Sequence, residues 1–151
     1  MDHRTLIETA LTYYVAGDVE QVMSMCSRDV VLQLYVSQNE LPFGGEARGS
    51  DGVRDQYFDM LALFDCLEYD PVLLDVRDGV ARIQTQFVYH HRESGERLAG
   101  SLRMVCTIKD DLISRIEEHH DEPMMKAFMR LAEWRVAEDG PVAPISWKLP
   151  T

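Results

Sequence analysis

The order of hydrophobic patterns along the 151-residue chain predicts an α+β fold in a single domain. Residues 4–64 mostly carry apolar residues at helical spacing, whereas residues 67–120 carry them at alternate positions. Short turn-like links at residues 78–79, 94–97 and 110–112 separate the alternating segments, which is typical of an antiparallel meander. Helices followed by such a meander are expected to cover one face of its sheet.

The first part of the chain is predicted to form two helices and a strand. Apolar residues near a 3.6-residue period predict a helix over residues 4–15, which Gly17 ends. Asp18 is a natural N-cap for a second, short helix over residues 18–26. The β-branched and aromatic run over residues 29–37 predicts a strand.

A polar, glycine-rich segment over residues 38–50 is predicted to be the main loop, and it leads into a third helix over residues 51–64. Ser50 or Asp51 is the expected N-cap of this helix. Its buried side is expected to carry the apolar residues Val53, Tyr57, Phe58, Leu61 and Phe64.

The meander is predicted to consist of four strands, over residues 67–79, 80–93, 98–109 and 113–120. Alternate residues of a strand share a face, and the apolar residues of the two middle strands keep one parity. These residues are Ala81, Ile83, Phe87 and Tyr89 on one strand, and Leu98, Leu102, Met104, Cys106 and Ile108 on the next. We expect the helices to bury this face.

A closing helix is predicted over residues 122–134, before a segment that contains three prolines. We therefore predict one domain over residues 1–135 and an extended tail over residues 136–151. The sequence has no internal repeat that would indicate another architecture.

Composition excludes several classes of partner. The net charge of −11 leaves no basic stripe for nucleic acid and disfavours anionic membrane surfaces. No segment approaches the ~20 apolar residues of a membrane span, and the first residues lack the apolar core of a secretory signal. Cys26, Cys66 and Cys106 are odd in number and widely spaced, which favours free thiols in a cytoplasmic protein.

Three stretches of the chain resemble the nuclear transport factor 2-like superfamily, specifically its SnoaL-like branch. Residues 13–32 are similar to the family's helix, Gly-Asp turn, helix and strand, and residues 41–61 to its Gly-rich loop before a helix. Residues 110–121 resemble its last strand, which often ends in Asp. The resemblance covers about residues 4–135 and implies a curved antiparallel sheet that forms a cone around the N-terminal helices and encloses an apolar pocket. It also implies a homodimer formed through the sheet and no cofactor.

The superfamily contains ketosteroid isomerases, but this chain departs from their pattern. The family's oxyanion-binding tyrosine, general-base aspartate and protonated aspartate align with Ala10, Leu34 and Met104. Apolar side chains cannot abstract a proton or hold an enolate oxygen. The resemblance therefore does not extend to standard ketosteroid isomerase chemistry.

Two other branches match in part. Glu118 aligns with the last-strand aspartate of limonene epoxide hydrolases, but their Arg and Asp partners fall near Thr85 and Phe87. Asp121 matches the general base of SnoaL-type cyclases, whose assisting histidine has no clear counterpart by spacing. The resemblance thus implies a catalytic role for Asp121 and leaves the chemistry open.

The end of the last strand carries the strongest candidates for acid–base chemistry. By strand alternation Ile116, Glu118 and His120 should face the core, while Glu117 and His119 face outward. Glu118 and His120 would then lie close enough for their side-chain tips to meet, and such a pair can poise a proton near neutral pH. The alternatives are a pocket lining without catalysis and a solvated strand end.

The pocket is expected to hold a small apolar molecule. Tyr14 and Tyr89 are candidate hydroxyl donors, and the predicted lining also includes Leu34, Phe43, Phe58, Phe87, Met104 and Ile116. The segment 41–45 is a candidate lid, although Gly-rich segments more often form turns. The methionines of the closing helix suit an adaptable core or pocket wall.

A metal site is not expected. His90 and His91 are adjacent, so they should point to opposite faces of a strand and cannot chelate one ion together. Two hypotheses follow. The chain is a cofactor-free isomerase, cyclase or hydrolase that uses Glu118, His120 and Asp121 on a carbonyl- or epoxide-bearing compound, or it is a non-catalytic ligand-binding or dimerisation module of the same fold.

Overall fold

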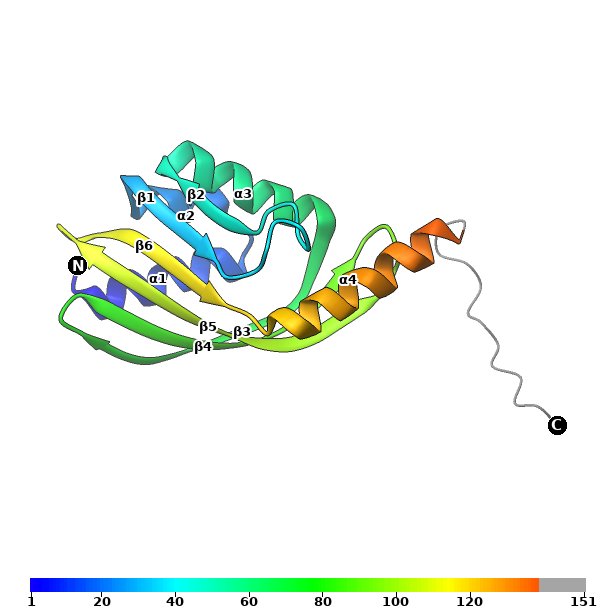
Figure 1. The fold of residues 1–151 in the computed structure, drawn as a ribbon. Helices are drawn as coiled ribbons and strands as arrows, with labels where there is room; N and C mark the ends of the chain where they lie inside the picture. The colour runs from blue at the N-terminus through cyan, green and yellow to red at the C-terminus, as the bar shows by residue number, and fades with distance from the viewer. Residues whose placement is uncertain (139–151) are drawn as a thin grey trace.

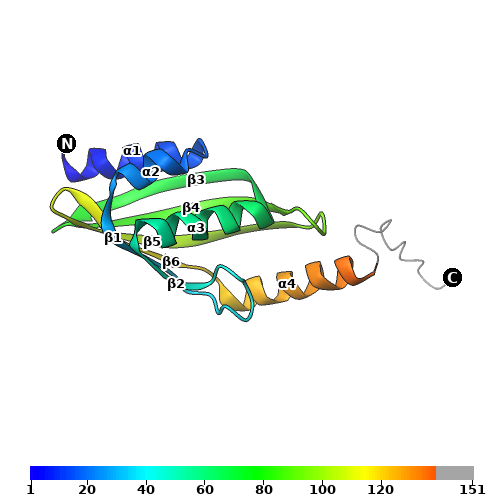
Figure 2. The ribbon, with the colours of Figure 1, turned by 90° about the horizontal axis from the view of Figure 1, so that it is seen from above.

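The computed structural model describes residues 1–138 as helices packed against one face of a curved sheet (Figure 1). Four helices are present in these residues: α1 (His3–Val15), α2 (Val19–Ser24), α3 (Gly49–Leu63) and α4 (Glu122–Ala137). Helices α1, α2 and α3 lie over the concave face of the sheet, and α4 extends from one end of it (Figures 1 and 2). The predicted α+β class is confirmed.

The sheet has six strands: β1 (Cys26–Leu34), β2 (Gly45–Arg48), β3 (Phe64–Arg77), β4 (Val80–His91), β5 (Arg97–Lys109) and β6 (Leu112–His119). Their order is β2-β1-β6-β5-β4-β3, so the sheet is open at β2 and β3. The meander β3–β6 is antiparallel as predicted, but β1 runs parallel to β6. The sheet is therefore mixed, because no tight turn sets the direction of β1 against β6.

Backbone conformation at the predicted links explains the meander. Asp78 and Gly79 both have positive φ, as do Asp110 and Asp111. Asp and Gly tolerate the left-handed region better than most residues do, so these pairs allow tight reversals between long strands. Ile108 of β5 donates its N–H to the Gly79 carbonyl at 2.7 Å, which ties the first of these turns to the neighbouring strand.

Helix starts follow the predicted caps in part. Asp18 accepts a hydrogen bond from the Gln21 N–H at 3.2 Å and begins α2, as predicted. The prediction of Ser50 or Asp51 as the cap of α3 is wrong, because α3 begins at Gly49 and its N-cap, Arg48, makes no side-chain cap. The predicted loop also contains β2, and that strand leads directly into α3.

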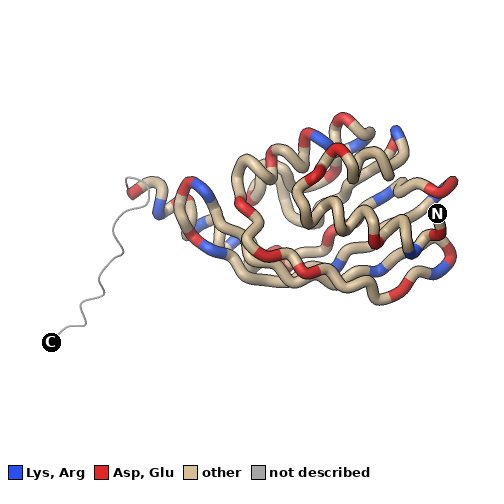
Figure 3. Tube along the Cα trace, turned by 180° about the vertical axis from the view of Figure 1, so that it is seen from behind, with Lys and Arg blue, Asp and Glu red and all other residues tan. Residues whose placement is uncertain are grey.

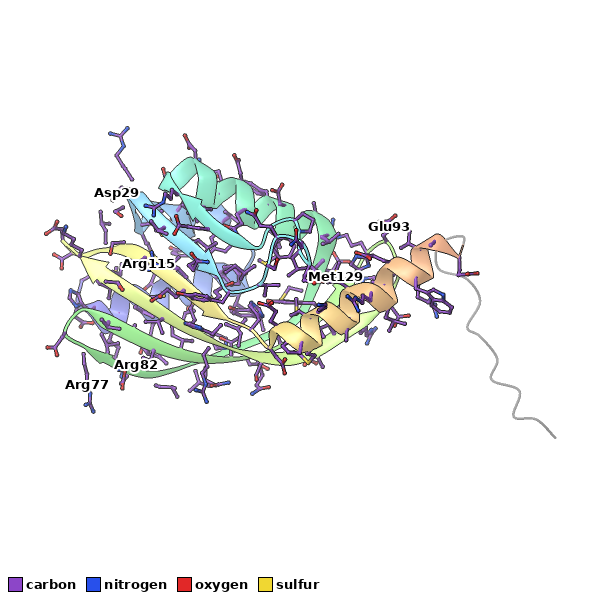
Figure 4. All side chains as sticks on the ribbon, in the orientation of Figure 1. Asp29, Arg77, Arg82, Glu93, Arg115 and Met129 are labelled. Carbon is purple, nitrogen blue, oxygen red and sulfur yellow. The ribbon has the colours of Figure 1, made fainter. Side chains whose placement is uncertain are left out.

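Helix α4 runs to Ala137, two residues past the predicted end of the domain at residue 135. The rest of the predicted tail, from Asp139 onward, lies outside the described residues. The buried side of α4 is formed by Met125, Phe128, Met129 and Ala132. Met129, which is labelled in Figure 4, is one of these buried residues.

The inner face of the sheet is the core of the molecule. Every apolar residue predicted to share this face of β4 and β5 is buried, which confirms the strand parity. Arg77 and Arg82 extend from the opposite side, away from the helices (Figure 4). Charged residues of both signs are spread along all parts of the described chain (Figure 3). In residues 1–138 no helix is long and apolar enough to cross a membrane.

Candidate functional site

A buried acid and a buried imidazole lie at the end of the strand β6. Glu118 is 3% exposed and lies between Leu34 of β1 and Met104 of β5 in the sheet register. The side chain of His120, which follows the strand, is 6% exposed. Glu117 and His119 face away from the core, so the predicted faces are confirmed.

Glu118 and His120 form an incompletely satisfied pair. His120 Nε2 lies 3.7 Å from Glu118 Oε2, which is an ion-pair distance but longer than a hydrogen bond. The other ring nitrogen, Nδ1, is buried and has no hydrogen-bond partner. The His120 ring stands edge-on to Phe87 at 5.9 Å between centroids. Both polar groups are thus held among apolar side chains with little to neutralise them.

Three buried tyrosines, Tyr57, Tyr69 and Tyr89, lie near enough to Glu118 for its charge to affect their pKa values. Burial raises the pKa of Tyr57 well above its ordinary value, and the negative charge of Glu118 raises it further. The same two causes act on the pKa of Tyr69. For Tyr89, burial and the neighbouring Tyr69 raise the pKa, and Glu118 adds to the shift. These phenols therefore stay protonated and can act only as neutral hydrogen-bonding groups near neutral pH.

A cavity of about 280 Å³ opens beside these tyrosines, between the end of α1, helix α3 and the start of β3. Its lining consists of Tyr14, Val15, Ala16, Gly17, Val19, Tyr57, Met60, Leu61, Phe64, Asp65, Cys66, Tyr89 and Arg92. Asp65 and Arg92 are half-exposed and form an ion pair at 2.8 Å, so they mark the polar rim. The interior is mainly aromatic and apolar, as expected for a small-molecule site.

A second void of about 30 Å³ lies deeper in the core and shares Tyr14 and Tyr57 with the larger cavity. The centroids of these two rings are 5.5 Å apart, so the rings partition the interior. The remaining lining of the void is apolar: Ile7, Ala10, Leu11, Val22, Ile83, Met104, Cys106, Ile113 and Ile116. The void is about the size of one water molecule. Apart from the two tyrosines, its lining offers a water molecule few hydrogen-bond partners.

An aromatic wall separates the acid–base pair from the larger cavity. Phe87 stacks on Tyr89 at 4.3 Å, and Tyr89 lines the cavity while Phe87 contacts His120. Glu118 and His120 themselves are not part of the lining. Of the predicted lining residues, Tyr14 and Tyr89 contact the larger cavity, and Met104 and Ile116 contact the small void. Leu34 and Phe87 are packed in the core.

Three predicted site residues lie elsewhere. Asp121 is exposed and caps α4 by accepting the Met124 N–H at 3.1 Å, so the structure places it outside the pair's buried site. Phe58 is 47% exposed, and the prediction that it faces the pocket is wrong. Phe43 is buried against Phe64, with centroids 6.2 Å apart, but does not line the cavity.

The candidate lid at residues 41–45 is a packed segment of the core. Leu41 is 1% exposed and Phe43 is 6% exposed. A Cβ added to Gly44 would stand 2.3 Å from the Val36 carbonyl oxygen, so the backbone approaches too closely there for any side chain. Gln56 of α3 donates a hydrogen bond to the Phe43 carbonyl, which fixes the segment from the other side.

The two adjacent histidines point to opposite sides of β4, as predicted. His90 faces outward and pairs with Asp65 at 3.2 Å. His91 is buried, and its Nδ1 accepts hydrogen bonds from the Ser94 hydroxyl at 2.7 Å and the Ser94 N–H at 3.2 Å. Burial lowers the pKa of His91. Within residues 1–138 no three potential metal ligands come together.

The sequence analysis missed two polar residues on the inner face of the sheet. Thr85 is fully buried on the inner face of β4, and Tyr69 is 7% exposed on β3. The signal for Thr85 was available, because it is a polar residue at the apolar parity of its strand. Tyr69 gave no such signal, since β3 is exposed over most of its length and its parity shifts at two irregularities.

Comparison with known proteins adds information on the fold. No family model matches the chain, and no curated protein matches its sequence. Among solved structures, a candidate SnoaL-like polyketide cyclase from Mesorhizobium loti is similar with a TM-score of 0.68 at 12% identity, covering 80% of this chain and 100% of its own. An NTF2-like protein of unknown function from Burkholderia pseudomallei gives 0.72 at 14% identity, with 85% and 95% covered.

A third similar structure is TerC crystallised with polyporic acid, with a TM-score of 0.70 at 16% identity, covering 85% of this chain and 96% of TerC. Identities this low establish shared architecture and not shared chemistry. The chain therefore has the fold of the nuclear transport factor 2-like proteins and of the SnoaL-like structures among them, which confirms at the level of fold the resemblance predicted from its sequence.

Proposed function

We propose that the chain binds a small apolar molecule and that Glu118 and His120 act on it by general acid–base catalysis without a cofactor. The observation that supports this proposal is the buried pair, in which His120 Nδ1 has no partner. Removing a carboxylate and an imidazole from water is costly unless both are fully paired. A purely structural role leaves this cost unexplained.

The two side chains have distinct proposed roles. Glu118 faces His120 Nε2 and orients the ring, which leaves Nδ1 as the nitrogen that takes a proton from a bound molecule or gives one back. A molecule that reaches Nδ1 has to enter beside the ring of Phe87, which now lies between the pair and the cavity. Isomerisation, cyclisation and hydrolysis would all use such a pair.

The size and lining of the cavity favour a compact ring compound that carries a carbonyl group or an epoxide. A cavity of about 280 Å³ lies at the small end of ligand pockets, and its tyrosine and phenylalanine rings suit stacking. TerC, which shares the fold, was crystallised with the small molecule polyporic acid. That structure supports the proposal that a protein of this fold can hold a small molecule.

Hydrogen–deuterium exchange at a carbon beside a carbonyl tests the acid–base role with a simple probe. The wild-type protein is expected to accelerate exchange of phenylacetone in D₂O, followed by proton NMR. Glu118→Gln and His120→Gln should each slow this exchange by about 100-fold or more, because general acid–base groups typically contribute that much.

Matched controls are available on the same strand. Glu117→Gln and His119→Gln change the neighbouring side chains, which face outward and contact Arg115 and Tyr35. Both controls should exchange phenylacetone at the wild-type rate. Equal rates for Glu118→Gln and Glu117→Gln would contradict the assignment of Glu118.

The second candidate function is a non-catalytic ligand-binding or dimerisation module. It is favoured by the wall of Phe87 and Tyr89 between the pair and the cavity. In that case phenylacetone shifts the NMR signals of Tyr57 and Tyr89, but its hydrogens are not exchanged faster than in buffer alone.

The homodimer through the sheet remains a prediction. Val72 and Leu74 of β3 are exposed, and light scattering tests the prediction by measuring the molecular mass.

A further inference from the structure

Two buried hydroxyl groups on the inner face of the sheet have no hydrogen-bond partner. Thr85 of β4 is fully buried and Tyr69 of β3 is 7% exposed, yet both side-chain oxygens are unpaired. Native proteins satisfy nearly all buried hydroxyls through side chains, backbone or bound molecules, so a pair of exceptions requires an explanation.

The two hydroxyls belong to one place. In the register of β3 and β4, Tyr69 lies opposite Phe87 and Thr85 lies opposite Pro71, so Tyr69 and Thr85 are diagonal neighbours on the same face. Burial and the charge of Glu118 raise the pKa of Tyr69, and the Thr85 hydroxyl opposes this rise, which reflects the closeness of the two groups. The contact between the two hydroxyls acts as a weak hydrogen bond on the pKa of Tyr69 but falls short of ordinary hydrogen-bond geometry, so each hydroxyl lacks a full partner.

Tyr69 and Thr85 are linked to the larger cavity by the ring of Tyr14. The Tyr69 ring packs on Tyr14 with centroids 4.9 Å apart, and Tyr14 lines both the larger cavity and the inner void. Ile83, two residues before Thr85 on the same face, also lines the void. Tyr69 therefore lies one ring behind the lining of both spaces, and neither Tyr69 nor Thr85 is itself part of that lining.

We infer that Tyr69 and Thr85 form the polar subsite that binds the oxygen of a ligand whose apolar part occupies the tyrosine-lined cavity. The inference rests on the ligand binding proposed above and adds the recognised group. A carbonyl, ether or epoxide oxygen accepts two hydrogen bonds, and each hydroxyl can donate one. The nearby carboxylate of Glu118 disfavours an anionic ligand, so the recognised oxygen is neutral.

Removing the hydroxyl of Thr85 or of Tyr69 should change ligand affinity without lowering the stability of the protein. Without ligand, Thr85→Val removes an unsatisfied buried hydroxyl, so its stability in urea unfolding should equal or exceed that of the wild type. The affinity of this variant for phenylacetone should fall about tenfold, since one hydrogen bond to the ligand oxygen is lost. Its affinity for propylbenzene, which lacks the oxygen, should not change. Tyr69→Phe should behave in the same way.

Binding is measured by NMR titration of both probes, with two controls. Thr85→Ser keeps the hydroxyl and should restore the preference for the ketone. Tyr35→Phe removes the hydroxyl of a tyrosine that contacts Glu117 on the outer face and should leave both affinities unchanged. Suppose that both probes bind the wild type and that Thr85→Val and Tyr69→Phe still bind phenylacetone more tightly than propylbenzene, as the wild type does. In that case the subsite is overturned, while the proposed ligand binding stands. If neither probe binds the wild type, the proposed function and the subsite are both overturned.

Discussion

At the scale of single residues, the candidate site depends on two polar side chains, Glu118 and His120, that face the core at the end of β6. Successive strand residues alternate strictly between faces, so Glu118 and His120 could be placed inward from the position of Ile116 alone. A helix turns by about 100° per residue, so Phe58 points away although Tyr57 is buried. The place of Asp121 as the N-cap of α4 was not foreseen, because an acid that ends a strand and one that caps the next helix look the same in sequence.

The hydrogen bonds of His91 lead to a prediction about pH. Its Nδ1 accepts two hydrogen bonds from Ser94, so the folded state holds the neutral ring, and burial lowers the pKa of His91. Glu93 raises that pKa and His90 lowers it, both by less than burial does. The unfolded chain therefore binds the proton more readily, and this contribution to stability is complete above about pH 6.5 and lost as the pH falls below it.

We expect His91→Asn to flatten the decline in the free energy of unfolding between pH 7.5 and pH 5.5, measured by urea titration. The control is His119→Asn, because His119 is exposed and should leave the decline as it is in the wild type. A decline equally steep in His91→Asn and the wild type would show that His91 does not carry the effect.

At the scale of secondary-structure elements, the long meander was predictable because each reversal has its own turn signal. Asp78-Gly79 and Asp110-Asp111 adopt positive φ where the sequence indicated turns. The edge strand β2 (Gly45–Arg48) could not be foreseen, since four residues give no periodicity and its partner strand β1 is distant from it in the predicted pattern. The parallel direction of β1 depends equally on distant residues.

The start of α4 provides a prediction that separates two roles of Asp121. As an N-cap, Asp121 can be replaced by Asn with little loss, whereas Asp121→Ala should cost about 1 kcal/mol in the free energy of unfolding. Urea titration followed by circular dichroism measures this cost. Asp121→Asn should also exchange phenylacetone at the wild-type rate. A large loss of exchange in a stable Asp121→Asn protein would instead support the predicted catalytic role of Asp121.

At the scale of the whole molecule, the curved sheet and its helices leave a cavity at one end and a packed interior at the other. Strand β1 pairs with β6, so the N-terminal part of the chain is built into the same sheet as the meander. The sequence predicted the layers because helices and strands are segregated along it. It could not predict how completely the interior would be filled, since that depends on side-chain packing across layers.

This shared sheet is expected to unfold as one unit. Leu32 of β1 is 2% exposed and lies beside Ile116 of β6, so Leu32→Ala should cost about 2–5 kcal/mol in the free energy of unfolding. Amide hydrogen exchange should show lower protection in β3 as well as in β6. Leu74→Ala, at an exposed position, is the control and should change little. Loss of protection confined to β1, β2 and β6 would indicate that the first strands open separately.

The parallel contact between β1 and β6 also bears on how the protein is made. The Tyr35 N–H donates to the Glu118 carbonyl at 2.9 Å, so the backbone that carries the acid is held by a segment synthesised far earlier. A nascent chain on the ribosome consequently has no support for Glu118 until β6 has emerged and joined β1. Shortened products that stop before β6 would lack the acid and would also leave the edge of β5 that pairs with β6 open to aggregation.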